Sequence, residues 1–129
     1  MRTTLLAFVA WVAWVALSTS LPALAHHSTA NFDLMKHVTF TGTVKDCTFT
    51  NPHSVIDMDV VDKSGTVHHY KLASIPKVSM ARSGWASGDL KVGDTVTVTS
   101  NPDRRDTSYL FLEKITFVSG KTWDRNRLF

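Results

Sequence analysis

The chain has 129 residues, and its formal net charge of +3 comes from basic residues that are scattered along it. This pattern suits solubility or weak attraction to an anionic envelope surface, and it argues against a basic stripe that binds nucleic acid. The single cysteine, Cys47, excludes an internal disulfide, so packing must stabilise the fold. Its simplest interpretation is a small strand residue, with an intermolecular disulfide or a metal thiolate as the alternative.

The N-terminus has the three parts of a secretory signal peptide. Arg2 supplies the positive charge, residues 5–17 are all apolar, and Ala-Leu-Ala at residues 23–25 satisfies the small-x-small rule for cleavage. An uncleaved anchor is the less favoured alternative, because a membrane span needs about 20 apolar residues. We therefore expect residues 1–25 to be removed. The mature chain then begins at His26, has no membrane span, and is periplasmic or secreted.

Strand-like alternation follows a polar lead at residues 26–37. The first strand is expected over residues 38–49, where Gly42 suggests a bulge or a sharp bend. Asn51-Pro52 predicts a turn directly after it, since the proline keeps the preceding residue out of helical space.

A hairpin with a turn at residues 63–65 is the best defined element, with Gly65 in the left-handed conformation. Its register places Ile56 opposite Leu72, Met58 opposite Tyr70 and Val60 opposite His68 on one face. On the other face Asp57 lies opposite Lys71 and Asp59 opposite His69. Every pair is chemically compatible, which favours this register over a slip by one residue.

The second half of the mature chain predicts one short helix and two more strands. The helix is expected over residues 74–84, with Ser74 as its N-cap and Gly84 at its end. Strands follow within residues 90–102 and 108–118. The second of these changes parity at Glu113-Lys114, which predicts a bulge.

Together these elements predict an all-β domain at residues 38–129 with one short helix. Five strands with bends in the first and the last are typical of a small five-stranded OB-like Greek-key barrel. A two-sheet sandwich is the alternative, but five main strands are few for that fold.

Several stretches of the mature chain carry a resemblance: AHHSTANFD, FTGTV, FTNPH, ARSGW and LKVGDTVTV. They resemble a family of small exported bacterial proteins classed as a domain of unknown function (6152-type). The most specific pieces are His26-His27-Ser28, Asn51-Pro52-His53 and Gly84-Trp85. The resemblance implies an exported OB-like domain without an established activity. The His68-His69 pair is not a feature of that resemblance.

Histidine is the residue that suggests chemistry, since the chain holds six. If cleavage exposes His26, its α-amine and Nδ1 can chelate one metal ion, and nitrogen donors in a planar set favour Cu(II). His27 or His53 can supply a further nitrogen, and His69, oriented by Asp59, is an alternative ligand. The sequence thus predicts a copper site. The alternatives are a solvated tail at the terminus, a turn histidine at position 53 and an ordinary charge pair between Asp59 and His69.

The predicted function is that of an exported binding protein with copper as its candidate ligand. A non-catalytic scaffold that docks an envelope protein through Trp85, Trp123 and Arg125 is the alternative. An enzyme is disfavoured, because the sequence has no nucleophile elbow, phosphate loop, CxxC or HExxH motif. A copper-dependent oxidative enzyme is a remote alternative. Nucleic acid is not expected as a partner, since the outward face of the hairpin has no aromatic platform.

Overall fold

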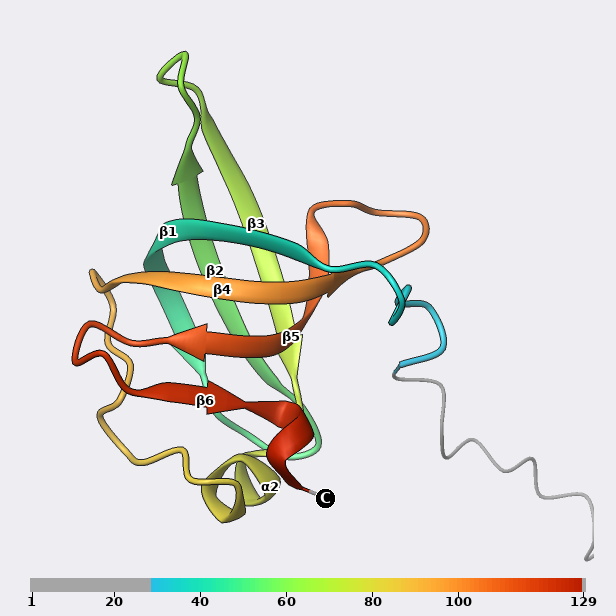
Figure 1. Cartoon of the computed structure of the whole chain (residues 1–129), viewed down its shortest axis with the longest axis vertical. Helices are drawn as coiled ribbons and strands as arrows, with labels where there is room; N and C mark the ends of the chain where they lie inside the picture. The colour runs from blue at the N-terminus through green and yellow to red at the C-terminus, as the bar shows by residue number, and fades with distance from the viewer. Residues whose placement is uncertain (1–28, 129) are drawn as a thin grey trace, which may run out of the picture.

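The computed structural model describes residues 29–128, which form one strongly curved sheet and two short helices (Figure 1). The strands are β1 (Val38–Thr48), β2 (Ser54–Val61), β3 (Val67–Ser74), β4 (Thr95–Pro102), β5 (Tyr109–Thr116) and β6 (Thr122–Asp124). Helix α2 (Lys77–Arg82) lies between β3 and β4, and a 3-10 helix, η1 (Arg125–Leu128), follows β6. Within this range no helix has the length and apolar character to cross a bilayer. The expected signal peptide lies outside the described residues.

The sheet closes into a barrel. Its strand order is β3-β2-β1-β4-β5-β6, and a parallel pairing of β3 with β5 joins the two sides. The long strand β1 pairs with β4 through its first half and with β2 through its second half. Five closed strands with a helix between the third and the fourth confirm the predicted OB-like barrel and exclude the sandwich. The short strand β6, which the sequence analysis does not predict, extends the sheet beyond β5.

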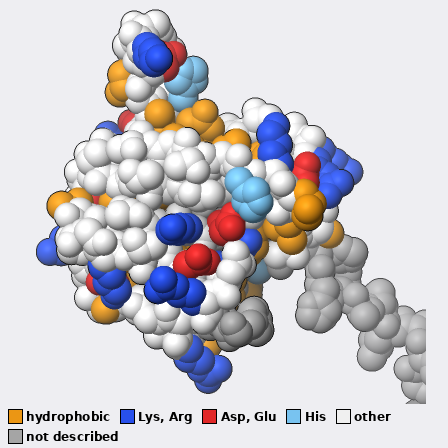
Figure 2. Space-filling model, viewed as in Figure 1, with side chains coloured by type: hydrophobic (Ala, Val, Ile, Leu, Met, Phe, Trp, Pro, Cys, Tyr) orange, Lys and Arg blue, Asp and Glu red, His pale blue; other side chains and the backbone are white. Residues whose placement is uncertain are grey.

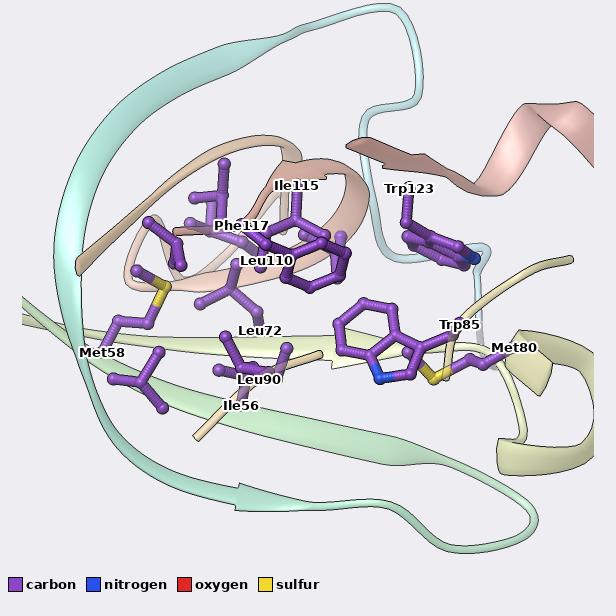
Figure 3. Packing of buried hydrophobic residues seen from close by; sticks show 14 residues of the cluster. Ile56, Met58, Leu72, Met80, Trp85, Leu90, Leu110, Ile115, Phe117 and Trp123 are labelled. Carbon is purple, nitrogen blue, oxygen red and sulfur yellow. The ribbon is translucent and has the colours of Figure 1, made fainter. Parts of the chain in front are cut away.

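Apolar side chains that alternate along the strands fill the barrel (Figure 3). Ile56, Met58, Val96 and Val98 are at most 1% exposed, as the predicted strand faces require. Burying a side chain of this size contributes about 1.5–3 kcal/mol, so these strands hold the barrel together through their inward faces.

The β2–β3 hairpin has the register predicted from the sequence. Asp59 lies opposite His69, and all the other predicted pairs are also observed. The backbone N–H of Asp62 donates to the Thr66 carbonyl at 2.9 Å, and Gly65 has a φ of +86°. The hairpin extends well past the barrel (Figure 1), so the side chains at its tip are exposed to solvent.

Bulges shape both β1 and β5. In β1 the register shifts between Val44 and Asp46, so the extra residue is Lys45 and not Gly42. At Gly42 a Cβ atom would stand 2.7 Å from the Asp59 carbonyl oxygen, so the close approach of β2 requires a glycine there.

The bulge in β5 falls where the sequence predicts it. Thr99 pairs with Lys114 while Ser100 pairs with Leu112, which leaves Glu113 as the extra residue. The parity change along this strand is thereby explained, because Leu112 and Ile115 both point into the core.

Helix α2 is shorter than expected, and its first turn is capped from another element. The Ser74 side chain is buried at the end of β3 and does not cap the helix. The backbone N–H of Val78 instead donates to Asn51 Oδ1 at 3.4 Å. The turn predicted at Asn51-Pro52 therefore also holds the start of the helix.

The described part of the polar lead packs on the barrel. Phe32 is 4% exposed and forms an isolated bridge with Asp103. Its ring centroid lies 5.3 Å from those of Tyr109 and Phe111, and the same small cluster includes Ala73. This contact fixes the chain a few residues beyond the expected mature terminus.

Candidate functional site

Of the three predicted copper ligands, His53 lies in the described part of the chain, and His26 and His27 lie outside it. His53 is exposed between the Asn51-Pro52 turn and the start of β2. It lines a shallow cavity of about 230 Å³ together with Asn31, Phe32, Ala73, Ser74, Asp103, Tyr109 and Phe111. A loop histidine is thus placed beside the N-terminal segment.

Backbone hydrogen bonds hold this N-terminal segment at the cavity. The N–H of Arg104 donates to the Asn31 carbonyl at 2.9 Å, and the N–H of Asp33 donates to the Pro102 carbonyl at 2.8 Å. Phe32 lies between these two bonded residues and is buried against Phe111 and Tyr109. Asn31 is therefore held on the same cavity as His53 by packing and by hydrogen bonds together.

A carboxylate lines the cavity as well. Asp103 Oδ1 accepts hydrogen bonds from the backbone N–H groups of Arg105 at 2.7 Å and Asp106 at 3.1 Å, which fix its orientation. The cavity thus offers one imidazole and one carboxylate. Among residues 29–128 no group of three metal-ligating side chains is found.

The Asp59–His69 pair forms the cross-strand contact that the register predicts. His69 Nδ1 lies 2.5 Å from Asp59 Oδ1, and Lys45 Nζ lies 3.7 Å from the other carboxylate oxygen. His69 is 79% exposed at its side chain, so the pair lies on the solvated face of the hairpin. It lines a different cavity of about 370 Å³, which shares no residue with the His53 cavity. The described residues therefore do not bring His69 and His53 together.

The two tryptophans assigned to a docking surface are core residues instead. Trp85 and Trp123 are 8% and 2% exposed, and their ring centroids lie 5.2 Å apart with the rings nearly perpendicular. Figure 3 shows both at one end of the core beside Met80. Their burial in the core cluster leaves little of either ring for a docking surface.

Arg125, the third residue of the predicted docking surface, makes its contacts within the domain. It donates hydrogen bonds to Asn101 Oδ1 and to the Leu112 carbonyl, both at 3.0 Å. Its guanidinium carbon lies 4.1 Å from the centroid of the Phe111 ring. Partial burial lowers the pKa of the guanidinium, against the opposing effects of Glu113 and Asp124. This arginine therefore ties the C-terminal segment to the barrel.

The outer face of β1 and β4 carries threonines in register. Thr39 contacts Thr99 at 2.9 Å and Thr41 contacts Thr97 at 2.8 Å, in each case between hydroxyl oxygens. In Figure 2 neither charged nor apolar side chains cover this part of the surface. The hydroxyl pairs thus link the exposed sides of β1 and β4 across the sheet.

The fold and its cavities define a small all-β domain, an OB-like barrel with an exposed histidine at a cavity shared with its N-terminal segment. The chain belongs to DUF6152, a family of unknown function whose model matches residues 14–110. No curated protein matches the chain. One solved structure that matches is a mitochondrial single-stranded DNA binding protein from S. cerevisiae, Rim1. The identity is 10% and the TM-score 0.49, over 64% of this chain and 94% of that chain.

Proposed function

We propose that this protein is a small exported binding protein whose mature N-terminus binds Cu(II) next to His53. The α-amine and Nδ1 of His26 form the chelate after cleavage behind Ala25, and His27 or His53 completes the nitrogen set. One observation carries the proposal: Asn31 is held on the cavity that His53 lines.

The length of the intervening chain supports this assignment. An extended chain spans at most about 3.5 Å per residue, so the Cα atom of His27 lies within about 14 Å of that of Asn31. Because Phe32 is buried, the chain is anchored beside the cavity six residues after His26. Such a tether raises the effective concentration of the terminal donors at His53.

The donor chemistry favours copper. The terminal amine titrates near ~8 and imidazole near ~6.5, so both can lose their protons to a metal ion at neutral pH. Cu(II) binds nitrogen donors in a square-planar arrangement and heads the divalent affinity order. The Asp103 carboxylate at the same cavity adds a negative charge that attracts a divalent cation.

The scaffold alternative has less support. Two of the three residues assigned to its docking surface, Trp85 and Trp123, are buried, and Arg125 is engaged within the domain. Binding of a small ligand at the N-terminal cavity is therefore the function that the geometry supports best.

Copper titration with electron paramagnetic resonance tests the proposal. The two samples are the protein that begins at His26, verified by mass spectrometry, and the same protein with its N-terminal amine acetylated. Acetylation removes the amine donor of the chelate, so affinity should fall at least about tenfold, or ~1.4 kcal/mol. His68→Gln is the matched control, because His68 lies at the hairpin tip with its Nε2 2.8 Å from Asp62. Equal copper binding by both samples would refute the chelate.

A further inference from the structure

A third cavity, of about 380 Å³, lies at the end of the barrel that helix α2 covers. Its apolar wall includes Phe49 directly after β1, Met80 of α2, and Trp85 and Leu90 of the loop before β4. It shares no residue with the cavities at His53 and at Asp59. Cavities that bind small molecules have about this size and an apolar, partly aromatic lining with a few polar groups.

We propose that this cavity binds a small amphipathic anion, a molecule with an apolar ring or short acyl chain and one carboxylate or sulfonate group. The apolar body lies against Phe49 and Trp85, and the anionic group pairs with Lys77. This inference is independent of the proposed copper site, since it involves neither the N-terminus nor a metal ion.

The aromatic wall fits a flat or flexible apolar group. The ring centroids of Phe49 and Trp85 lie 5.3 Å apart at an interplanar angle of 53°, so together they form an angled wall. Trp85 also packs edge-on against Phe117 and Trp123, which fixes its ring. Met80 lines the cavity with an unbranched thioether side chain that adapts to the shape of an occupant.

Lys77 supplies the charge that selects an anion. It is exposed at the start of α2 and lines the cavity. Within the described range it forms no ion pair, whereas Lys45, Lys71 and Lys121 each have a carboxylate within 4 Å. A cation beside an apolar wall pairs more strongly with an anion than a fully solvated lysine does, because the bound ligand displaces water.

The reactivity of Cys47 can report whether this cavity is occupied. Its half-buried thiol lines the cavity. Burial raises the pKa of the thiol, and the charges of Asp46 and Asp94 raise it further, so a smaller fraction of the thiol is ionised and alkylation is slowed. An occupant of the cavity shields the thiol and slows alkylation further.

The experiment measures Cys47 alkylation and ligand affinity with two probes, decanoate for an acyl chain and 1-naphthoate for a ring. Both arms test the same amphipathic chemistry, and the tighter probe shows which apolar body fits. At least one probe should slow alkylation several-fold at saturation, and Lys77→Gln should weaken its binding about fivefold or more. Lys91→Gln is the matched control, because Lys91 does not line the cavity and should leave affinity unchanged.

A steric pair of variants completes the test. Ala81 lines the cavity, so Ala81→Leu should reduce affinity, whereas Ala86→Leu, outside the cavity, should not. Both positions are exposed, so the variants should fold, which circular dichroism verifies. The proposal is overturned if neither probe protects Cys47, or if the two lysine variants bind the protecting probe equally.

Discussion

The indole Nε1 of Trp123 donates a hydrogen bond to Ser83 Oγ at a distance of 2.8 Å. Trp123 belongs to β6, the last strand, and Ser83 is the C-cap of α2, so the bond joins two elements 40 residues apart across the closed end of the barrel. Trp123 is almost fully buried, which leaves water little access to its N–H group.

Ser83→Ala should therefore destabilise the protein by about 1–3 kcal/mol, the cost of a buried donor without a partner. Chemical denaturation measures the free energy of unfolding. Ser87→Ala is the control, since Ser87 is exposed and should change stability by less than about 0.5 kcal/mol. Equal stability of the two variants would show that the bond contributes nothing.

Gly42→Ala should cost about 1–3 kcal/mol of folding free energy, the range observed for overpacked sites. The added methyl group meets the Asp59 carbonyl oxygen at 2.7 Å and Val60 Cγ2 at 2.9 Å. Denaturant unfolding again provides the measurement, with Thr41→Ala as a neighbour on the solvated face for comparison. A Gly42→Ala protein as stable as wild type would contradict the close approach of β1 and β2.

The hairpin turn should weaken in acid. Hydrogen bonds from the Ser64 hydroxyl, from His68 and from the Thr66 backbone lower the pKa of Asp62 well below its usual value. A lowered pKa in the folded state contributes stability that is present above the unfolded pKa of about 3.9. That contribution is lost as the pH falls towards the folded value. The difference in unfolding midpoint between wild type and Asp62→Asn should thus shrink from about pH 5 to about pH 2. A difference that stays constant over this range would contradict the assignment.

Phe32→Ala should weaken copper binding although Phe32 is not a ligand. Loss of the Phe32 ring removes the packing that holds Asn31 at the His53 cavity, so the proposed terminal donors are no longer kept close to His53. Met35→Ala is the matched control, because Met35 lies in the same segment and is 89% exposed. Titration of the processed variants with Cu(II) should show a weaker Phe32→Ala site and an unchanged Met35→Ala site. The tether plays no role if the two affinities agree.

The sequence predicts the β2–β3 hairpin well because its information is local. Asp57 opposite Lys71 and Asp59 opposite His69 are pairs that a slip by one residue would break, and a glycine marks the turn. The bulge at Glu113 is predictable for a similar reason, since a change in the parity of apolar residues requires an extra residue.

Long-range contacts account for what the sequence analysis misses. Phe32 is a single aromatic residue in a polar segment, and its burial depends on Tyr109 and Phe111, far away along the chain. Trp85 and Trp123 stand in short segments without periodicity, so nothing local distinguishes a core position from an exposed one. Ser74 has the residue type of an N-cap, but Asn51 of another loop accepts the bond.

The candidate copper site is likewise only partly predictable from the sequence. The proposed terminal histidine is an inference from the cleavage motif, whereas the proximity of His53 and Asp103 to the N-terminal segment is not predictable from the sequence. That proximity depends on the backbone bonds of Asn31 and Asp33 to the β4–β5 region, which no sequence pattern indicates.

The most direct test of the copper site is a set of ¹H–¹⁵N correlation spectra of the processed protein, recorded as Cu(II) is added. Paramagnetic Cu(II) broadens the amide signals of the residues around it. Up to one equivalent, the account predicts selective loss of signals from residues at the cavity, including Asn31, His53 and Tyr109. Signals from the hairpin tip at Lys63 and His68 should persist. Broadening centred on the hairpin tip or on His69, or spread evenly over the spectrum, would contradict a copper site at the N-terminal cavity.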